Sequence, residues 1–150
     1  MKLILTTLFL VYLSTSALSQ EYRLEIGTRT GCSGRGICTI TSTPNPVDKT
    51  AKNTNNASII LAANGSTVLR VYREKLTQEE LDHILGGPIP SKGKEASEFI
   101  MEEALPLPEE IIAITATDKS KQLSVLEAKI YPTVITDEYI DITILDPEKK

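Results

Sequence analysis

Alternation of apolar and polar residues predicts β-strands near both ends of the chain. Residues 22–26 (YRLEI) place an apolar side chain at every second position, which is the period of a half-buried strand. Residues 37–43 (ICTITST) are rich in β-branched side chains that favour strands. These two segments predict a hairpin with the glycine-rich stretch 31–36 (GCSGRG) near its tip. Residues 140–144 alternate isoleucine with aspartate or threonine, which predicts a further strand.

A second hairpin is predicted around Asn64 and Gly65. The two arms on either side, SIILAA and STVLRVY, are rich in β-branched and aliphatic residues. Asn-Gly tolerates positive φ at both central positions, which a two-residue hairpin turn requires.

Capping signals mark a short helix over about 77–85 (TQEELDHIL). Thr77 and Glu80 have the spacing of a capping box, in which each side chain satisfies a backbone N–H of the other residue. Gly86 suits the left-handed residue that ends a helix, and Pro88 prevents its continuation. The apolar face of this helix would hold Leu81, Ile84 and Leu85.

Helical periodicity predicts a second helix over about 94–104 (KEASEFIMEEA), with Ala96, Phe99 and Ile100 turned inward. Residues 110–117 (EIIAITAT) read as a buried strand, and residues 122–131 as a less regular one. The sequence therefore predicts an α+β fold. It would contain a mostly antiparallel sheet of about five to seven strands in hairpins, with one or two short helices at about 77–85 and 94–104.

The first 19 residues have the pattern of a secretory signal peptide. Lys2 precedes an apolar run over 3–13, and small polar residues follow it. This run is shorter than the ~20 residues that a membrane-spanning helix needs. We expect cleavage between Ser19 and Gln20, a single small globular domain over 20–150, and a secreted or periplasmic location. No later segment is long and apolar enough to cross a membrane.

Composition narrows the classes of partner. The formal net charge of the chain is −4. An acidic chain is a poor match for nucleic acid, whose binders are usually basic, and for electrostatic attachment to anionic lipid. The sequence does not identify the partner; the class that it leaves is another extracellular or periplasmic protein, and no motif calls for a cofactor.

Both cysteines of the chain, Cys32 and Cys38, lie in the glycine-rich stretch. Their C-x5-C spacing is not that of a C-x-x-C redox pair, and with a single histidine the chain has too few ligands for a closed zinc site. In an oxidising compartment this pattern predicts a Cys32–Cys38 disulfide and no metal site. Closing the loop 32–38 would stabilise the fold by about 2.4 kcal/mol in the chain-entropy model.

Arg35 is the candidate binding residue, because it would stand at the tip of the clamped loop 32–38. Such a loop with a basic tip can inhibit trypsin-like proteases or act as a recognition finger. Gly34 and Gly36 flank Arg35 and work against the preorganisation that a tight inhibitor needs. The alternative is a clamped turn in which the glycines only supply positive φ.

Other candidate chemistry is sparse, and no catalytic residue is assigned. His83, the only histidine, is expected to face water on the polar side of the 77–85 helix, which removes histidine-based triads. A carboxylate-dependent hydrolase would need two acids in a cleft, roughly 5–9.5 Å apart. The candidates are Glu109, Glu110, Asp137, Glu138 and Asp141.

Two Asn-x-Ser triplets start at Asn56 and Asn64, and either could accept an N-linked glycan in a eukaryote. The first lies at the end of a long predicted loop over 44–58. The favoured interpretation of the chain is an exported, non-catalytic binding or scaffolding protein. Two alternatives stay open: a protease inhibitor or effector acting through Arg35, and a carboxylate-dependent hydrolase of extracellular glycans.

Overall fold

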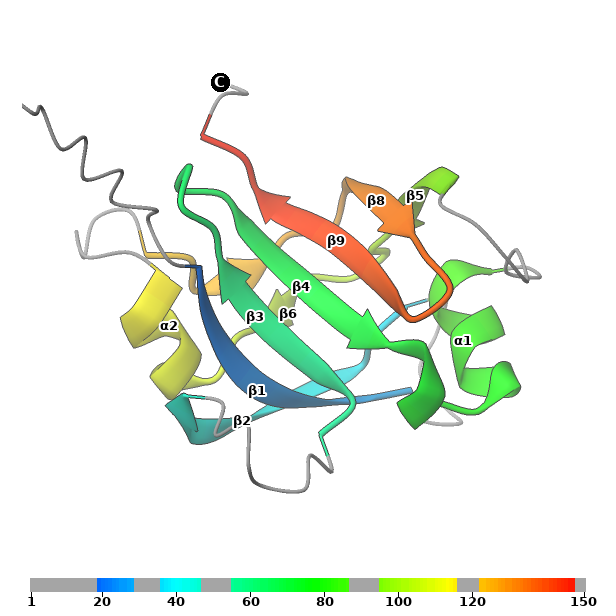
Figure 1. Cartoon of the computed structure of the whole chain (residues 1–150), viewed down its shortest axis with the longest axis horizontal. Helices are drawn as coiled ribbons and strands as arrows, with labels where there is room; N and C mark the ends of the chain where they lie inside the picture. Colours follow the sequence, from blue (N-terminus) through cyan, green and yellow to red (C-terminus); the bar gives the residue numbers. More distant parts are fainter. Residues whose placement is uncertain (1–18, 29–35, 47–54, 87–94, 116–121, 148–150) are drawn as a thin grey trace, which may run out of the picture.

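The computed structural model describes residues 19–28, 36–46, 55–86, 95–115 and 122–147. Its elements are shown in Figure 1 and run along the chain as β1 (Gln20–Gly27), β2 (Thr39–Pro46), β3 (Ala57–Leu61), β4 (Thr67–Tyr72), the short 3-10 helix η1 (Arg73–Lys75), α1 (Gln78–Leu85), β5 (Glu95–Ile100), β6 (Leu105–Pro106), α2 (Glu109–Thr115), β7 (Val125–Leu126), β8 (Ile130–Ile135) and β9 (Tyr139–Leu145).

Seven of the strands form one sheet in the order β2-β1-β3-β4-β9-β8-β5, and β6 pairs with β7 separately. Every neighbouring pair is antiparallel. The predicted α+β fold with a mostly antiparallel sheet is therefore confirmed. The last strand, β9, lies between β4 and β8 and joins the strands of the first half of the chain to β8 and β5.

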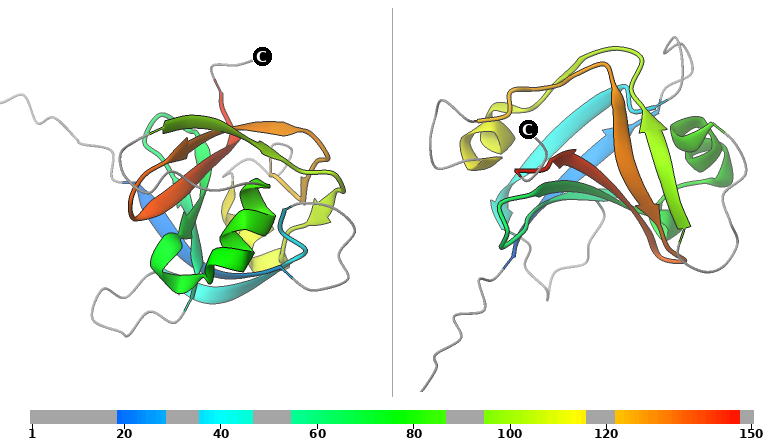
Figure 2. Two further views of the ribbon diagram at one scale, coloured as in Figure 1. Left: turned by 90° about the vertical axis from the view of Figure 1, so that its right-hand side faces the viewer. Right: turned by 90° about the horizontal axis from the view of Figure 1, so that it is seen from above.

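The seven-stranded sheet is strongly curved. Figure 2 shows that β5 and β8 rise on one side of the enclosed space while β1 and β2 line the other. Helix α1 lies beside β5 at one end of the molecule, and α2 lies beside β2 at the other end. This curvature places one face of every strand toward a common interior.

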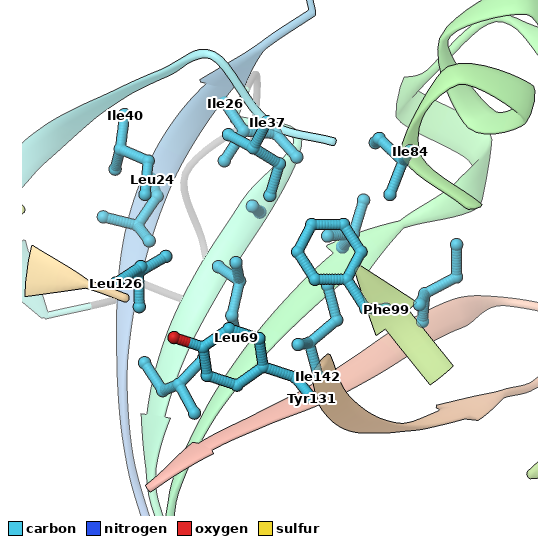
Figure 3. Close-up of a cluster of buried hydrophobic side chains, with 14 of the residues drawn as sticks. Leu24, Ile26, Ile37, Ile40, Leu69, Ile84, Phe99, Leu126, Tyr131 and Ile142 are labelled. Atoms are coloured by element: carbon cyan, nitrogen blue, oxygen red, sulfur yellow. The ribbon is translucent and has the colours of Figure 1, made fainter. Parts of the chain in front are cut away.

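The interior is filled by aliphatic side chains that alternate along the strands. In β9, Ile140 and Ile142 have no exposed surface and Ile144 is nearly buried, as the alternation of that segment predicts. Figure 3 shows side chains from β1, β2, β4, β8 and β9 converging with Phe99 of β5 and Ile84 of α1. Among the described residues, Phe99 is the largest side chain that is fully buried.

Gly36 closes the curved sheet. A Cβ atom on Gly36 would lie 3.4 Å from Cζ of Phe99 and 3.6 Å from the carbonyl oxygen of Ile100. The N–H of Gly36 donates to the carbonyl oxygen of His83 at the end of α1, over 3.1 Å. The segment that leads into β2 therefore packs on both β5 and α1, and the next side chain, Ile37, is buried.

Both predicted hairpins are confirmed, although the second has a different turn. Gly65 N–H donates to Ala62 oxygen, and Ala62 N–H donates to Ser66 oxygen, both over 2.9 Å. Gly65 has a φ of 85°, and no described residue other than glycine has positive φ. This is a three-residue loop with a glycine bulge, whereas the sequence predicts a two-residue turn with Asn64 also at positive φ.

The predicted caps of α1 are confirmed. The side chain of Thr77 accepts from the N–H of Glu80, and the Glu80 carboxylate accepts from the N–H of Thr77. Gly86 ends the helix in the left-handed conformation, with a φ of 69°. Leu81 and Ile84 are buried, so the apolar face also lies where the sequence places it.

The predicted helix over 94–104 is wrong. The segment contains β5, which pairs residue by residue with β8, so that Phe99 lies opposite Tyr131 and Ile100 lies opposite Ile130. In a strand, neighbouring side chains point to opposite faces, so Phe99 is buried while Ile100 is 42% exposed. Pairing with a distant strand overrides the helical propensity of the segment.

The predicted strand over 110–117 is also wrong, because residues 109–115 form α2. The carbonyl oxygen of Pro108 accepts from the N–H groups of Ile111 and Ile112, over 2.9 and 3.0 Å. Glu109 and Glu110 occupy the first turn, where negative charge is favourable. The less regular strand predicted over 122–131 divides into β7 and the start of β8.

Truncation of Phe99 and of Ile100 distinguishes the strand from the predicted helix. We expect Phe99→Ala to lower the free energy of unfolding by about 3–5 kcal/mol, because it leaves a cavity in the core. Ile100→Ala should cost only about 1 kcal/mol, because that side chain points outward. Urea denaturation of both variants provides the measurement, and equal losses would contradict the strand assignment.

Candidate functional site: an arginine–tyrosine cluster on the outer face of the sheet

Polar and aromatic side chains gather on the outer face of the central strands. The positions that alternate with the buried ones point away from the core, and Figure 1 views β3, β4 and β9 from this side, with no described helix in front of them. We define the outer-face cluster by six residues from four strands: Glu21 (β1), Ser58 (β3), Arg70 and Tyr72 (β4), and Tyr139 and Asp141 (β9).

Arg70 and Asp141 form the central contact of the outer-face cluster. They lie directly opposite each other on β4 and β9. Nε of Arg70 donates to Oδ1 of Asp141 and Nη2 donates to Oδ2, each over 2.7 Å. This two-pronged geometry is the strong form of an arginine–carboxylate pair. Hydrogen bonding to Asp141 raises the pKa of Arg70 above its ordinary value.

The guanidinium of Arg70 also stacks on an aromatic ring. Its central carbon lies 3.8 Å from the ring centroid of Tyr139, a distance at which a cation is attracted to the face of the ring. The side chain of Arg70 keeps 27% of its surface exposed, and that of Asp141 keeps 21%. Arg70 is therefore fixed in position while remaining accessible from outside.

Tyr72 ties the outer-face cluster to β1 and β3. Its hydroxyl donates to the Glu21 carboxylate and lies 3.2 Å from Oγ of Ser58. Burial raises the pKa of Tyr72, and the hydrogen bond to Glu21 raises it further. The phenol consequently stays protonated at neutral pH and acts as a donor.

This arrangement is suited to recognition. It presents a fixed cation, two aromatic rings and two carboxylates that already have partners. Proton transfer would need an acid or base whose pKa lies near the working pH, and the raised pKa values of Arg70 and Tyr72 move both groups away from it. Within the described residues, no three histidine, cysteine, aspartate or glutamate side chains are grouped to hold a metal ion.

The site residues predicted in the glycine-rich stretch are only partly covered by the structure. Cys32 and Arg35 lie outside the described residues. Cys38 is described, and its N–H donates to the carbonyl oxygen of Gly27 over 2.8 Å, where the strands of the β1–β2 hairpin meet the connecting loop. The Cys32–Cys38 disulfide and the role of Arg35 stay predictions, as does the signal peptide, since residues 1–18 are also outside the described part.

His83 differs from its expectation as a solvated surface residue. It is half-buried, and its Nε2 atom is buried without a hydrogen-bond partner among the described residues. Its carbonyl oxygen accepts from the N–H of Gly36, so the end of α1 is bonded to the segment that leads into β2.

The candidate carboxylates are divided between distant places. Glu109 and Glu110 lie exposed on α2, whereas Asp137 and Glu138 lie exposed in the turn between β8 and β9, at the other end of the molecule in Figure 1. The pKa of Glu110 is lowered by its own backbone N–H and by the Ser42 hydroxyl, which donates over 2.9 Å. A glycosidase acid needs a raised pKa, so Glu110 is unsuited to that role.

The sequence indicates which way the central side chains of the outer-face cluster point, but not that they are in contact. Alternation in the segments TVLRVY and YIDITIL indicates that Arg70 and Asp141 point outward. Their contact depends on the register between two strands 71 positions apart along the chain. Nothing in the local pattern reveals that register, and the notable clustering of cysteine and glycine lies elsewhere.

Comparisons with known proteins supply no relative. No protein-family model matches the chain, and searches of curated proteins and of solved structures also find no match. Among the described residues, no helix has the length and apolar character needed to cross a membrane. A functional assignment therefore rests on the geometry of the chain itself.

Two tyrosines should make the stability fall at alkaline pH. Burial is the largest cause that raises the pKa of both Tyr72 and Tyr131 above the ordinary value of 10.0. Above about pH 10 the unfolded chain loses these protons first, so the unfolded state is increasingly favoured until the folded-state pKa values are passed. We expect a declining free energy of unfolding in this range, measured by urea denaturation, and a shallower decline in Tyr72→Phe and Tyr131→Phe. An unchanged slope in both variants would contradict this origin.

Proposed function

We propose that this chain is an exported, non-catalytic binding protein that recognises a protein partner through the outer-face cluster. The observation that carries the proposal is the Arg70 guanidinium, which is held by two hydrogen bonds to Asp141, is stacked on Tyr139 and remains partly exposed. Arginine and tyrosine are enriched among the residues that dominate protein–protein binding energy.

Preorganisation strengthens this interpretation. A binding site loses affinity when long side chains must be immobilised as the complex forms. Here Arg70 and Tyr72 are already restrained by partners on neighbouring strands. A partner that covers the outer-face cluster would meet these side chains in the positions that they already occupy.

One feature of the fold supports the proposal that the chain is exported. The strand β1 begins at Gln20, the residue that would follow the predicted cleavage after Ser19. Removal of residues 1–19 would therefore leave β1 and its pairing with β2 and β3 complete. In the oxidising compartment reached by export, we propose that Cys32 and Cys38 form the predicted disulfide.

Matched removal of two ion pairs tests the proposed binding surface. The double variant Arg70→Ala/Asp141→Ala removes the central pair without changing the net charge. Glu127→Ala/Lys129→Ala removes an exposed pair elsewhere, whose charged atoms lie 3.1 Å apart. We expect extracellular material from the source to contain a protein that the immobilised mature chain and the control variant retain, and that the first variant loses.

Quantitative mass spectrometry of the retained proteins is the measurement, and thermal unfolding verifies that both variants are folded. Equal retention by both double variants would exclude the outer-face cluster as the binding surface. Retention of no protein by the folded wild type would argue against the binding function itself.

The second candidate function, inhibition of a protease through Arg35, gains support from Gly36. Glycines on both sides of Arg35 would be expected to leave the loop too flexible for a tight inhibitor. Gly36 is buried against Phe99 with a φ of 115°, and its N–H is bonded to His83, so its conformational freedom is already removed. Cys38 is anchored to Gly27 in the same way. The chain that follows Arg35 is thus held in place.

Inhibition assays against trypsin-like proteases test this second candidate. If Arg35 is the residue that enters a protease, the mature wild type should inhibit and Arg35→Ala should not. The exposed basic residue Lys129 provides the control, because Lys129→Ala should leave inhibition intact. A wild type that inhibits no such protease would remove this candidate.

A further inference from the structure

The structure separates the two Asn-x-Ser triplets of the chain. The first comprises Asn56, Ala57 and Ser58, at the start of β3. The second comprises Asn64, Gly65 and Ser66, in the loop between β3 and β4. Both match the acceptor for an N-linked glycan, whose attachment needs an accessible side-chain amide.

The amide of Asn56 serves as part of the sheet. Its Oδ1 accepts from the N–H of Ile26, and its Nδ2 donates to the carbonyl oxygen of Ile26, each over 2.8 Å. The side chain thereby satisfies both backbone groups of Ile26 beyond the last paired position, where Leu24 of β1 lies opposite Ala57 of β3. The hydroxyl-bearing member of this triplet, Ser58, has no exposed surface.

A glycan on Asn56 would remove this pairing. A substituent on an amide nitrogen strongly prefers the position trans to the carbon chain, which is the position on the same side as the oxygen. An amide that bonds both backbone groups of one residue uses the hydrogen on that same side. The sugar would therefore replace the hydrogen that Nδ2 donates to Ile26, and it would lie against the β1 backbone.

Asn64 has the opposite environment. It lies on an exposed loop together with Ala63 and Gly65. Its Oδ1 accepts from the N–H of Ser66 over 3.0 Å and from Oγ of Ser66 over 2.7 Å. Among the described residues, none is hydrogen-bonded to Nδ2 of Asn64. A substituent on this nitrogen would extend from the tip of the hairpin and disturb no sheet contact.

We propose that Asn64 carries an N-linked glycan, and that Asn56 does not, when the chain is exported through a compartment that attaches such glycans. In this step, Nδ2 of Asn64 forms a bond to the first sugar carbon of a lipid-linked oligosaccharide diphosphate. The bond from that carbon to the phosphate oxygen breaks, the lipid diphosphate leaves with the electron pair, and the nitrogen loses one proton. The proposal rests on the export part of the proposed function, and it does not depend on the outer-face cluster.

The position of the glycan is compatible with binding through the outer-face cluster. Asn64 lies just before β4 begins at Thr67, whereas Tyr72 ends that strand and lies opposite Tyr139. The hairpin tip and the tyrosine end of the cluster are thus at opposite ends of β4. A glycan at the tip would leave that end of the sheet accessible.

Secretion of the full chain from a eukaryotic cell line tests the proposal. Peptide mapping of the secreted wild type, after treatment with peptide-N-glycosidase, identifies each modified asparagine because the enzyme converts it to aspartate. We expect complete or nearly complete occupancy at Asn64 and none detectable at Asn56. Asn64→Gln and Ser66→Ala should each abolish the mass shift, whereas Asn56→Gln should retain it in whatever fraction is secreted.

A glycan on Asn56 in secreted, folded protein would overturn the proposal, and so would an unmodified Asn64. Lys75→Asn provides the control for export, because with Thr77 it creates a third triplet at an exposed position. If this variant gains a glycan while the wild type has none, only the assignment of Asn64 fails. If the variant also lacks a glycan, the chain has not entered the lumen, and the export proposal fails together with the glycan.

Discussion

The contact between Gly36 and Phe99 is the constraint on which the rest of the structure depends. The sheet encloses a core on one of its faces because it is curved. This curvature brings the segment that precedes the edge strand β2 into contact with the other edge strand, β5, across the interior. Gly36 suits that junction because its φ of 115° is a backbone conformation that residues with a side chain rarely adopt, and it lies against the Phe99 ring and the Ile100 carbonyl. The N–H of the same residue donates to the carbonyl oxygen of His83 at the end of α1, which fixes one side of the glycine-rich stretch.

Local chemistry allowed some elements to be predicted from the sequence. The reciprocal cap of Thr77 and Glu80 and the hairpin around Gly65 are decided by residues close together in the chain. Of the two failures, the one over 94–104 arises from a distant contact, whereas the one over 110–117 does not. β5 is a strand because β8 pairs with it, despite a helical pattern. α2 had a usable local signal that the β-branched residues obscured, since Pro108 and two acids mark the first turn of a helix.

The candidate site was less predictable than the fold for the same physical reason. Period-two alternation establishes that Arg70 and Asp141 point outward, but their contact follows from the pairing of β4 with β9. Arg35 and the two cysteines stand out in the sequence because they lie close together in one short, glycine-rich stretch. The structure instead brings together charged and aromatic residues on strands, which have no unusual spacing in the sequence.

The central place of β9 has a consequence for how the chain matures. β1, β3 and β4 can pair as soon as they are made, but β5 and β8 reach them only through β9. The apolar faces of the two halves consequently stay open until β9 has emerged, and the core assembles in a late, concerted step. Until β9 is made, only the part of the sheet that contains β1, β3 and β4 can form, and the apolar faces of both halves must be shielded from other chains.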